Sequence, residues 1–250
     1  LLPKGAIMML GGETKIGKSF LALDLADNIA SGGLVWGWQP ALPTPVLYVE
    51  VELGWFGVQK RLKARYKDLP PPPEGFWVSS RDPEVKLDTF KGLDRIRALL
   101  DRTEAGVVIF DPVARLMLGL DFDGGQVGRA LANIDRLLGE RPELSVVLIH
   151  HFVKPRESLA GDSFYRFRGG RWMDAADVLC VVERKSKRGE TFLWRVHWTL
   201  RHDIEPDQEW FRADERGRVF TADPPKTPKP SETLSATALE RLVSVRERRD

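Results

Sequence analysis

A short glycine-rich stretch near the N-terminus, Gly11 to Ser19, has the residue types and spacing of a loop that binds phosphate groups. Its sequence, GGETKIGKS, contains the Walker A pattern Gly12-x-x-x-x-Gly17-Lys18-Ser19. The glycines let the backbone N–H groups wrap around phosphates, the lysine adds a positive charge, and the serine hydroxyl reaches Mg²⁺. We therefore predict an ATP site formed by Gly12, Glu13, Thr14, Lys15, Ile16, Gly17, Lys18, Ser19 and Phe20.

The residues on either side of this loop have the patterns that a phosphate-binding loop requires. Ala6 to Leu10 is an apolar run typical of a buried strand. Ser19 to Ala26 has apolar residues at the i, i+3 and i+4 spacing of a helix. A helix that begins at the loop directs unpaired N–H groups and the positive end of its dipole at the phosphates. The strand–loop–helix order favours a phosphate site over a chance glycine-rich turn.

Polar residues also follow three other apolar runs, each of which predicts a buried strand. In a mostly parallel sheet the carboxyl ends of the strands meet at one edge, where ligands bind. We therefore expect these polar residues to lie near the phosphate loop. They are Glu50 and Glu52 after 46–49, Asp111 after 107–110, and His150 with His151 after 145–149.

Asp111 has the position of a Walker B aspartate, which would hold the Mg²⁺ shell opposite Ser19. The alternative is an acid that caps the turn at Pro112. Many ATPases place a catalytic glutamate directly after this aspartate, but here Pro112 follows. The carboxylate that orients the attacking water must then come from another strand. We favour Glu52, with Glu50 as the alternative.

His150 and His151 could be mistaken for a metal-binding pair, but adjacent strand residues point to opposite faces. A sensor of the γ-phosphate is the favoured interpretation, and a histidine bonded to the backbone is the alternative. Several arginines could act as an arginine finger that reaches a neighbouring subunit's γ-phosphate. The candidates, each of which is by default solvated surface, are Arg166, Arg168, Arg171, Arg188 and Arg201.

The composition describes a globular protein: 250 residues, 42% hydrophobic, 30% charged, with a net charge of +2. That charge is too small to argue for nucleic acid. The single Cys180 excludes a disulfide within one chain and favours a reducing compartment. No apolar run approaches a membrane span and no signal peptide is evident, so we expect a cytoplasmic protein that does not enter a membrane.

Alternating strand and helix patterns predict an α/β fold, in which a mostly parallel twisted sheet carries helices on both faces. The C-terminal strands are expected to be antiparallel, with 192–200 as an edge strand and 210–212 with 218–220 as a closing hairpin. Three segments are predicted: an ATPase domain at 1–222, a proline-rich linker at 223–235, and a short helix at 236–250 that begins an appended domain.

Over roughly residues 3 to 222, these landmarks resemble the RecA-like P-loop NTPases, specifically the RepA-type hexameric helicase group. The matching segments are GGETKIGKSFLALDLA, VLYVEVE with Glu52 as catalytic glutamate, VVIFDPVARLMLGLDFD, VVLIHHFVKP, and Arg168-Gly169-Gly170 followed by Trp172. Two positions depart from the group. Gly170 replaces an expected serine, and Thr199-Leu200-Arg201 lacks the lysine of a Lys-x-Arg element.

The resemblance implies a homo-oligomer, usually a hexameric ring, with Mg²⁺ and ATP at subunit boundaries. It places Lys18, Glu52, His150, His151, Arg168 and Arg201 in catalysis, and Ser19 with Asp111 at the metal. Loops 116–126 and 154–168 would face a channel for single-stranded DNA. The expected function is a DNA helicase or translocase; the alternative is an ATP-switched assembly or regulatory protein without unwinding activity.

Overall fold

The strands of this protein form one sheet, and its carboxyl edge carries the phosphate loop. The computed structural model describes residues 2–38, 42–119, 124–152, 171–187, 190–201 and 209–223. Within them the sheet has nine strands in the order β3-β2-β4-β5-β1-β6-β7-β8-β9. The strands are β1 (Ile7–Gly12), β2 (Val46–Glu50), β3 (Phe76–Ser80), β4 (Val107–Asp111), β5 (Ser145–His151), β6 (Val178–Arg184), β7 (Leu193–Leu200), β8 (Glu209–Ala213) and β9 (Val219–Thr221).

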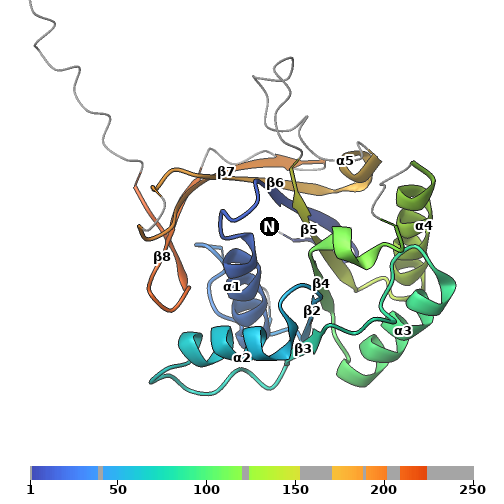
Figure 1. The fold of residues 1–250 in the computed structure, drawn as a ribbon, viewed down its shortest axis with the longest axis horizontal. Coiled ribbons are helices and arrows are strands. Elements are labelled where there is room, and N and C mark those ends of the chain that lie inside the picture. Colours follow the sequence, from blue (N-terminus) through green and yellow to red (C-terminus); the bar gives the residue numbers. More distant parts are fainter. Residues whose placement is uncertain are drawn as a thin grey trace, which may run out of the picture.

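Neighbouring strands from β3 to β6 are parallel, whereas β7, β8 and β9 pair antiparallel (Figure 1). The helical elements are α1 (Lys18–Ser31), α2 (Gly54–Arg65), α3 (Phe90–Thr103), the 3₁₀ helix η1 (Val113–Leu116), α4 (Gly124–Glu140) and α5 (Arg171–Ala175). None of the helices described is long and apolar enough to cross a membrane.

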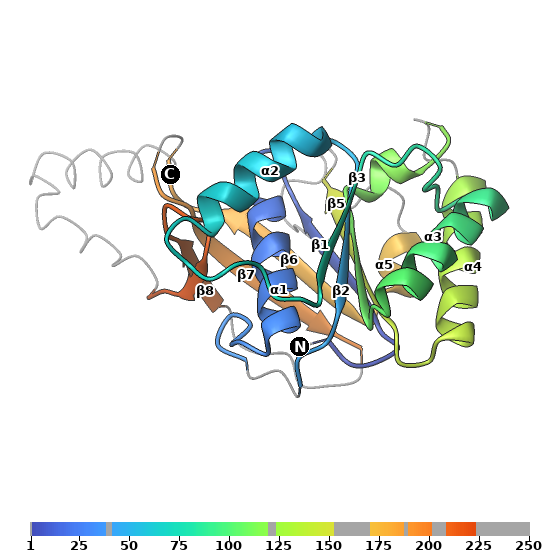
Figure 2. The same cartoon turned by 90° about the horizontal axis from the view of Figure 1, so that it is seen from below.

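Both faces of the parallel strands are buried, because α1 and α2 cover one face while α3, α4 and α5 cover the other (Figure 2). β1 shows the alternation that this requires. Met8 and Leu10 belong to the core cluster on the α1 side, and Ile7 and Met9 to the cluster on the α3 and α4 side. A strand buried on both faces has no polar alternation, which is why these strands appear in the sequence as continuous apolar runs.

The predicted fold class is confirmed, including the antiparallel C-terminal strands and the hairpin β8–β9. The prediction that 192–200 is an edge strand is wrong, because β7 pairs with β6 on one side and β8 on the other. Its Trp194, Val196 and Trp198 are buried and the residues between them are partly exposed. This alternation reports that one face is covered, and it does not distinguish an edge strand from an interior one.

Other differences are local. The sequence predicts a basic helix that begins at Val58, whereas α2 begins earlier, at Gly54. The short elements η1 and α5 are not predicted by the sequence pattern. The end of α1 agrees with the Ser31-Gly32-Gly33 stop signal: Gly32 has φ 72, the left-handed conformation that glycine adopts readily. The predicted C-terminal helix, and all of the predicted linker except Asp223, lie outside the described residues.

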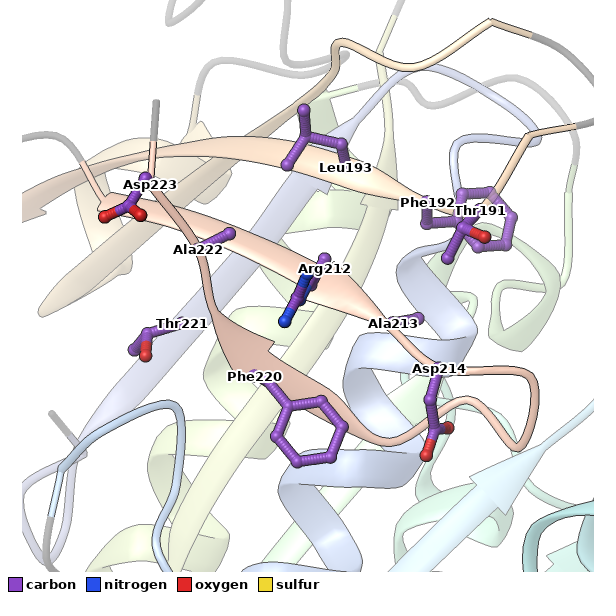
Figure 3. Close-up of a pocket in the computed structure, with 10 residues that line it drawn as sticks. All are labelled: Thr191, Phe192, Leu193, Arg212, Ala213, Asp214, Phe220, Thr221, Ala222 and Asp223. Carbon is purple, nitrogen blue, oxygen red and sulfur yellow. The ribbon is translucent and has the colours of Figure 1, made fainter. Parts of the chain in front are cut away.

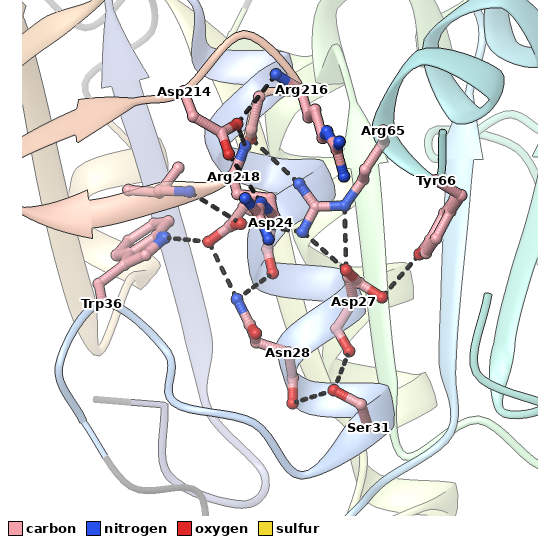
Figure 4. Close-up of polar contacts among 12 residues, drawn as sticks. Asp24, Asp27, Asn28, Ser31, Trp36, Arg65, Tyr66, Asp214, Arg216 and Arg218 are labelled. Carbon is pink, nitrogen blue, oxygen red and sulfur yellow. Dashed lines mark hydrogen bonds and ion pairs between the residues drawn. The ribbon is translucent and has the colours of Figure 1, made fainter. Parts of the chain in front are cut away.

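A buried group of charged residues ties α1 to α2 and to the β8–β9 hairpin (Figure 4). Arg65 of α2 donates to Asp24 at 2.9 Å and to Asp27 at 2.7 Å, and its third contact is the Gly217 carbonyl at 3.0 Å. The Asp24 carboxylate also accepts the backbone N–H of Val219 at 3.0 Å. Burial raises the pKa of Asp24, and the charge and hydrogen bonds of Arg65 oppose that shift. One arginine of α2 therefore bonds to groups from two other segments, α1 and the β8–β9 hairpin.

Arg65→Ala should lower the free energy of unfolding by about 3–5 kcal/mol, because it leaves two carboxylates without their buried partner. The Arg65 and Asp24 side chains are only 5% and 2% exposed. The control is Arg95→Ala, which removes an ion pair with Asp82 from a side chain that is 41% exposed. That change should cost less than about 1 kcal/mol. Urea unfolding measures both, and equal losses would contradict the structural role of Arg65.

Candidate nucleotide-binding site

The phosphate loop joins β1 to α1 at the carboxyl edge of the sheet, and its two motif glycines are required by close backbone approach. A Cβ at Gly12 would lie 2.7 Å from the Val182 carbonyl oxygen of β6. Gly17 has φ 98, and a Cβ there would lie 2.8 Å from the Trp194 ring. Any larger residue would displace the loop or its support.

Aromatic residues at the beginning of β7 support the loop. The indole N–H of Trp194 donates to the Ile16 carbonyl at 2.6 Å in a buried position. The Phe192 ring stacks on Trp194 with centroids 5.1 Å apart and also contacts Phe20 at 5.6 Å. The alternating pattern of this strand predicts only that Trp194 is a core residue. Alternation indicates burial but does not reveal a hydrogen bond to a loop. The antiparallel strands are therefore part of the phosphate site.

A pocket of about 800 Å³ lies over β7, β8 and β9, on the far side of Phe192 (Figure 3). Its lining includes Arg212, Asp214 and Phe220. Neither Lys18 nor Asp111 nor Glu52 lines it. This hollow is thus next to the aromatic support and separate from the residues predicted to hold phosphate and Mg²⁺.

Lys18 is buried, and carbonyl groups of the loop itself hold its ammonium. Its Nζ donates to the Gly12 carbonyl at 2.9 Å and to the Glu13 carbonyl at 2.6 Å. Burial lowers the pKa of Lys18 to about 8, against the raising effect of Asp111, Glu13 and Glu52. A phosphate anion at this point would stabilise the charged lysine.

Ser19 and Asp111 lie side by side, as a shared Mg²⁺ requires. The Asp111 carboxylate accepts hydrogen bonds from the Ser19 and Tyr48 hydroxyl groups, and Tyr48 comes from the neighbouring strand β2. Burial raises the pKa of Asp111, and these two hydrogen bonds oppose the shift. A hydroxyl and a carboxylate are oxygen ligands that suit Mg²⁺, so the residues present fit the ion. The role of Tyr48 was not anticipated, because its position inside a strand predicted only burial.

The two candidate glutamates have different surroundings. Glu50, the last residue of β2, is buried and its carboxylate accepts the backbone N–H groups of Glu52 and Leu53. Glu52 is exposed and lies in the turn that follows. Burial lowers the pKa of Lys18 and of His151, and the negative charge of Glu52 opposes the shift in both. Glu52 therefore lies within electrostatic reach of the phosphate loop, while Glu50 bonds to the turn.

The two histidines end β5 beside the loop, with His150 paired to Gly11 and His151 paired to Gly12 in the register of the strands. His150 is buried. Burial, together with the charge of Lys18, lowers the pKa of His151 to about 4, so this imidazole is neutral near pH 7. A neutral imidazole can both donate and accept a hydrogen bond, as a phosphate sensor would need. The sensor role stays a prediction.

Two of the candidate arginines, Arg201 and Arg171, lie within the described residues, where their contacts are with other segments; a role toward a neighbouring subunit stays a prediction. Arg201 follows β7, which runs antiparallel to β6, so Arg201 lies at the opposite edge of the sheet. Its backbone N–H donates to the Asp177 carbonyl, and its guanidinium lies 3.5 Å from the Asp177 carboxylate. Arg171 is exposed at the start of α5 and bonds to the Gly124 carbonyl. Arg166, Arg168 and Arg188, and loop 154–168 as a whole, lie outside the described residues.

A different arginine, Arg61 of α2, lies at the site. Its guanidinium is 5.3 Å from the centroid of the Phe20 ring. Burial raises the pKa of Asp111 and of Glu50, and the positive charge of Arg61 opposes the shift in both. The sequence around Arg61 predicts a basic helix but no specific role for this residue. A run of cations does not indicate which side chain faces inward.

A Walker A loop at the carboxyl edge of a parallel sheet, with a buried aspartate ending β4, which β5 separates from β1, is the arrangement of a RecA-like P-loop ATPase. Residues 1–157 match the family described as "AAA domain", and the chain belongs to that family. No curated protein matches the sequence significantly. Among solved structures, the fold is similar to a KaiC-like protein from the hyperthermophilic archaeon Pyrococcus horikoshii OT3, with a TM-score of 0.62 and 16% identity, over 89% of this chain and 91% of that one.

The lowered pKa of Lys18 predicts that nucleotide binding weakens at alkaline pH. In the free protein Lys18 loses its proton as the pH rises through about 8. Bound phosphate restores the proton, so binding should take up a proton above that pH, and affinity should fall by up to about tenfold per pH unit. The phosphates of ATP are already ionised there, and His151, with a pKa of about 4, is neutral throughout.

Fluorescent-nucleotide titrations between about pH 7 and 9.5 measure this slope. Lys18→Arg is the matched control, since a guanidinium keeps its charge over the whole range. Its affinity should be lower at pH 7, because the planar group is larger, yet independent of pH. A flat wild-type curve would show that Lys18 keeps its proton in the free protein.

Proposed function

We propose that this protein is a Mg²⁺-dependent ATPase that forms a ring and acts on single-stranded DNA as a RepA-like helicase or translocase. The observation that carries the hydrolytic part is the convergence of Lys18, Ser19, Asp111 and Glu52 at one sheet edge. They come from the ends of two strands and the start of one helix, which sequence distance alone would not bring together. Of the two glutamates, Glu50 bonds to the turn through Oε1, while Glu52 is exposed and lies within electrostatic reach of the phosphate loop.

In this proposal each residue has a role that follows from its position. The backbone of residues 12–17 and the ammonium of Lys18 would hold the β- and γ-phosphates, and Ser19 and Asp111 would hold Mg²⁺, which neutralises phosphate charge when bound. Glu52 would orient the attacking water and accept its proton. His151 would donate a hydrogen bond to the γ-phosphate from its neutral imidazole.

The position of Arg201 supports an oligomer. An arginine at the opposite edge of the sheet cannot reach the nucleotide of its own chain, but in a ring the opposite edge can face a neighbour's site. The proposed DNA contact depends on the resemblance to the RepA group and on the composition of loop 154–168, which contains Lys154, Arg156, Tyr165 and Arg166.

Glu52→Gln should reduce ATP turnover by at least about a hundredfold, because an amide accepts no proton from the attacking water. ATP affinity should stay within about twofold, since Glu52 holds none of the phosphate-binding groups. Phosphate release and nucleotide titration measure the two effects, and Glu140→Gln at the exposed end of α4 is the control. Normal turnover in Glu52→Gln would reject Glu52 as the group that activates water.

ATP hydrolysis with and without single-stranded DNA, at low and high salt, tests the functional class. A translocase should hydrolyse faster with DNA, and the gain should fall as salt weakens phosphate contacts. Particle mass with a non-hydrolysable ATP analogue tests the ring. An oligomer with no DNA response would favour the ATP-switched assembly protein, and a strict monomer would contradict any role for a neighbour's arginine.

A further inference from the structure

Glu52 lies in the turn between β2 and α2, where the backbone belongs to neither a strand nor a helix. β2 ends at Glu50 and α2 begins at Gly54, so Glu52 lies on a short connection and its side chain is exposed. An exposed side chain on an irregular turn would sample many positions. Activation of water needs a carboxylate held within a fraction of an ångström. Something other than secondary structure must therefore fix this residue.

The Glu50 carboxylate holds the turn from inside. Its Oε1 accepts the backbone N–H of Glu52 at 2.9 Å and that of Leu53 at 2.7 Å. The Glu50 residue is only 3% exposed. Both bonds go to one oxygen of a buried side chain, where water does not compete for them. The two bonds therefore fix the direction of the chain on both sides of the Glu52 Cα atom.

Arg81, which follows β3, holds the same turn from outside. Its Nη2 donates to the Glu52 carbonyl at 2.8 Å, and its own backbone N–H donates to the Glu50 carbonyl, also at 2.8 Å. Gly54 makes room for this contact: it has φ 69, and a Cβ there would lie 3.1 Å from Arg81 Cδ. Both backbone polar groups of Glu52 are thus bonded to side chains.

We propose that Glu50 and Arg81 are positioning residues, which hold the backbone of Glu52 and so aim its carboxylate at the attacking water. This inference rests on the proposed hydrolytic role of Glu52. Neither residue touches the phosphates in this scheme. Glu50 is therefore not an alternative catalytic glutamate, and it acts through its two backbone hydrogen bonds.

Three variants of Glu50 and Glu52 test this. Glu50→Ala should lower kcat about 10- to 100-fold, with ATP affinity changed less than about twofold. Glu50→Gln should restore kcat to within about threefold of wild type, because its amide oxygen can accept the same two bonds. The double variant Glu50→Ala/Glu52→Gln should be no slower than Glu52→Gln alone, since a residue that acts only through Glu52 has nothing left to position.

Arg81 gives a second test at an exposed site, where a substitution is compatible with folding even if Glu50→Ala is not. Arg81→Met should lower kcat several-fold, about three- to tenfold, at unchanged ATP affinity. Arg81→Lys, which keeps a donor, should recover part of the loss. Arg95→Ala is the matched control, because Arg95 bonds to Asp82 in the same loop but not to the turn.

The outcomes separate the two levels of the proposal. Full turnover in Glu52→Gln would remove the function on which the inference rests. An inactive Glu52→Gln with wild-type Glu50→Ala or Arg81→Met would overturn the positioning role alone. If Glu50→Gln were as slow as Glu50→Ala, kcat would depend on the negative charge of Glu50 and not on its two backbone hydrogen bonds. That result would overturn the positioning role of Glu50. Parallel loss of ATP affinity and kcat in Glu50→Ala would indicate a general structural role and would also overturn the inference.

Discussion

The buried ion pair between Arg65 and Asp24 joins the two helices that begin at the candidate site. α1 begins at Lys18, and α2 begins two residues after Glu52. A shift of α2 along α1 would move Glu52 relative to the phosphate loop, and it would also move Arg61, one helical turn before Arg65. Since breaking a buried pair leaves an uncompensated charge, the energetic penalty resists such a shift. The geometry of the site therefore depends on an interaction that contains none of its residues.

The C-terminal strands contribute to the same site, although the family match ends at residue 157. Trp194 of β7 bonds to the Ile16 carbonyl, and the Gly217 carbonyl between β8 and β9 accepts from Arg65. The phosphate loop is thus supported by β7, and the α1–α2 pair is closed by the hairpin. Removing β7 to β9 would leave Gly17 without its aromatic support and Arg65 without one of its partners. These strands therefore pack as one unit with the phosphate loop and the α1–α2 pair, while the domain boundary at 222 stays a prediction.

Residue periodicity and strand order are enough to predict which polar residues lie at one edge of the sheet. Asp111, Glu52, His150 and His151 could be placed at one edge because each follows an apolar run, and parallel strands bring such positions together. Trp194, Tyr48 and Glu50 could not be assigned their contacts in the same way. Each lies inside or at the end of a strand, where the pattern reports burial and not the hydrogen-bond partner. The partners of Trp194 and Tyr48 come from distant segments, and those of Glu50 come from the turn that directly follows it. Trp194 and Ile16, for example, are separated by 178 residues.

The antiparallel return of β7 explains why arginines near the C-terminus are hard to assign from sequence. In a parallel strand a terminal polar residue reaches the ligand edge, but this rule does not extend to residues that flank an antiparallel strand. β7 reverses direction, so its first residues contact the phosphate loop and Arg201, after its last, lies at the far edge. The residues of β7 that lie beside the phosphate loop are therefore those at the beginning of the strand. Arg61, from a helix between two parallel strands, supplies positive charge at the site, whereas Arg201 at the far edge pairs with Asp177.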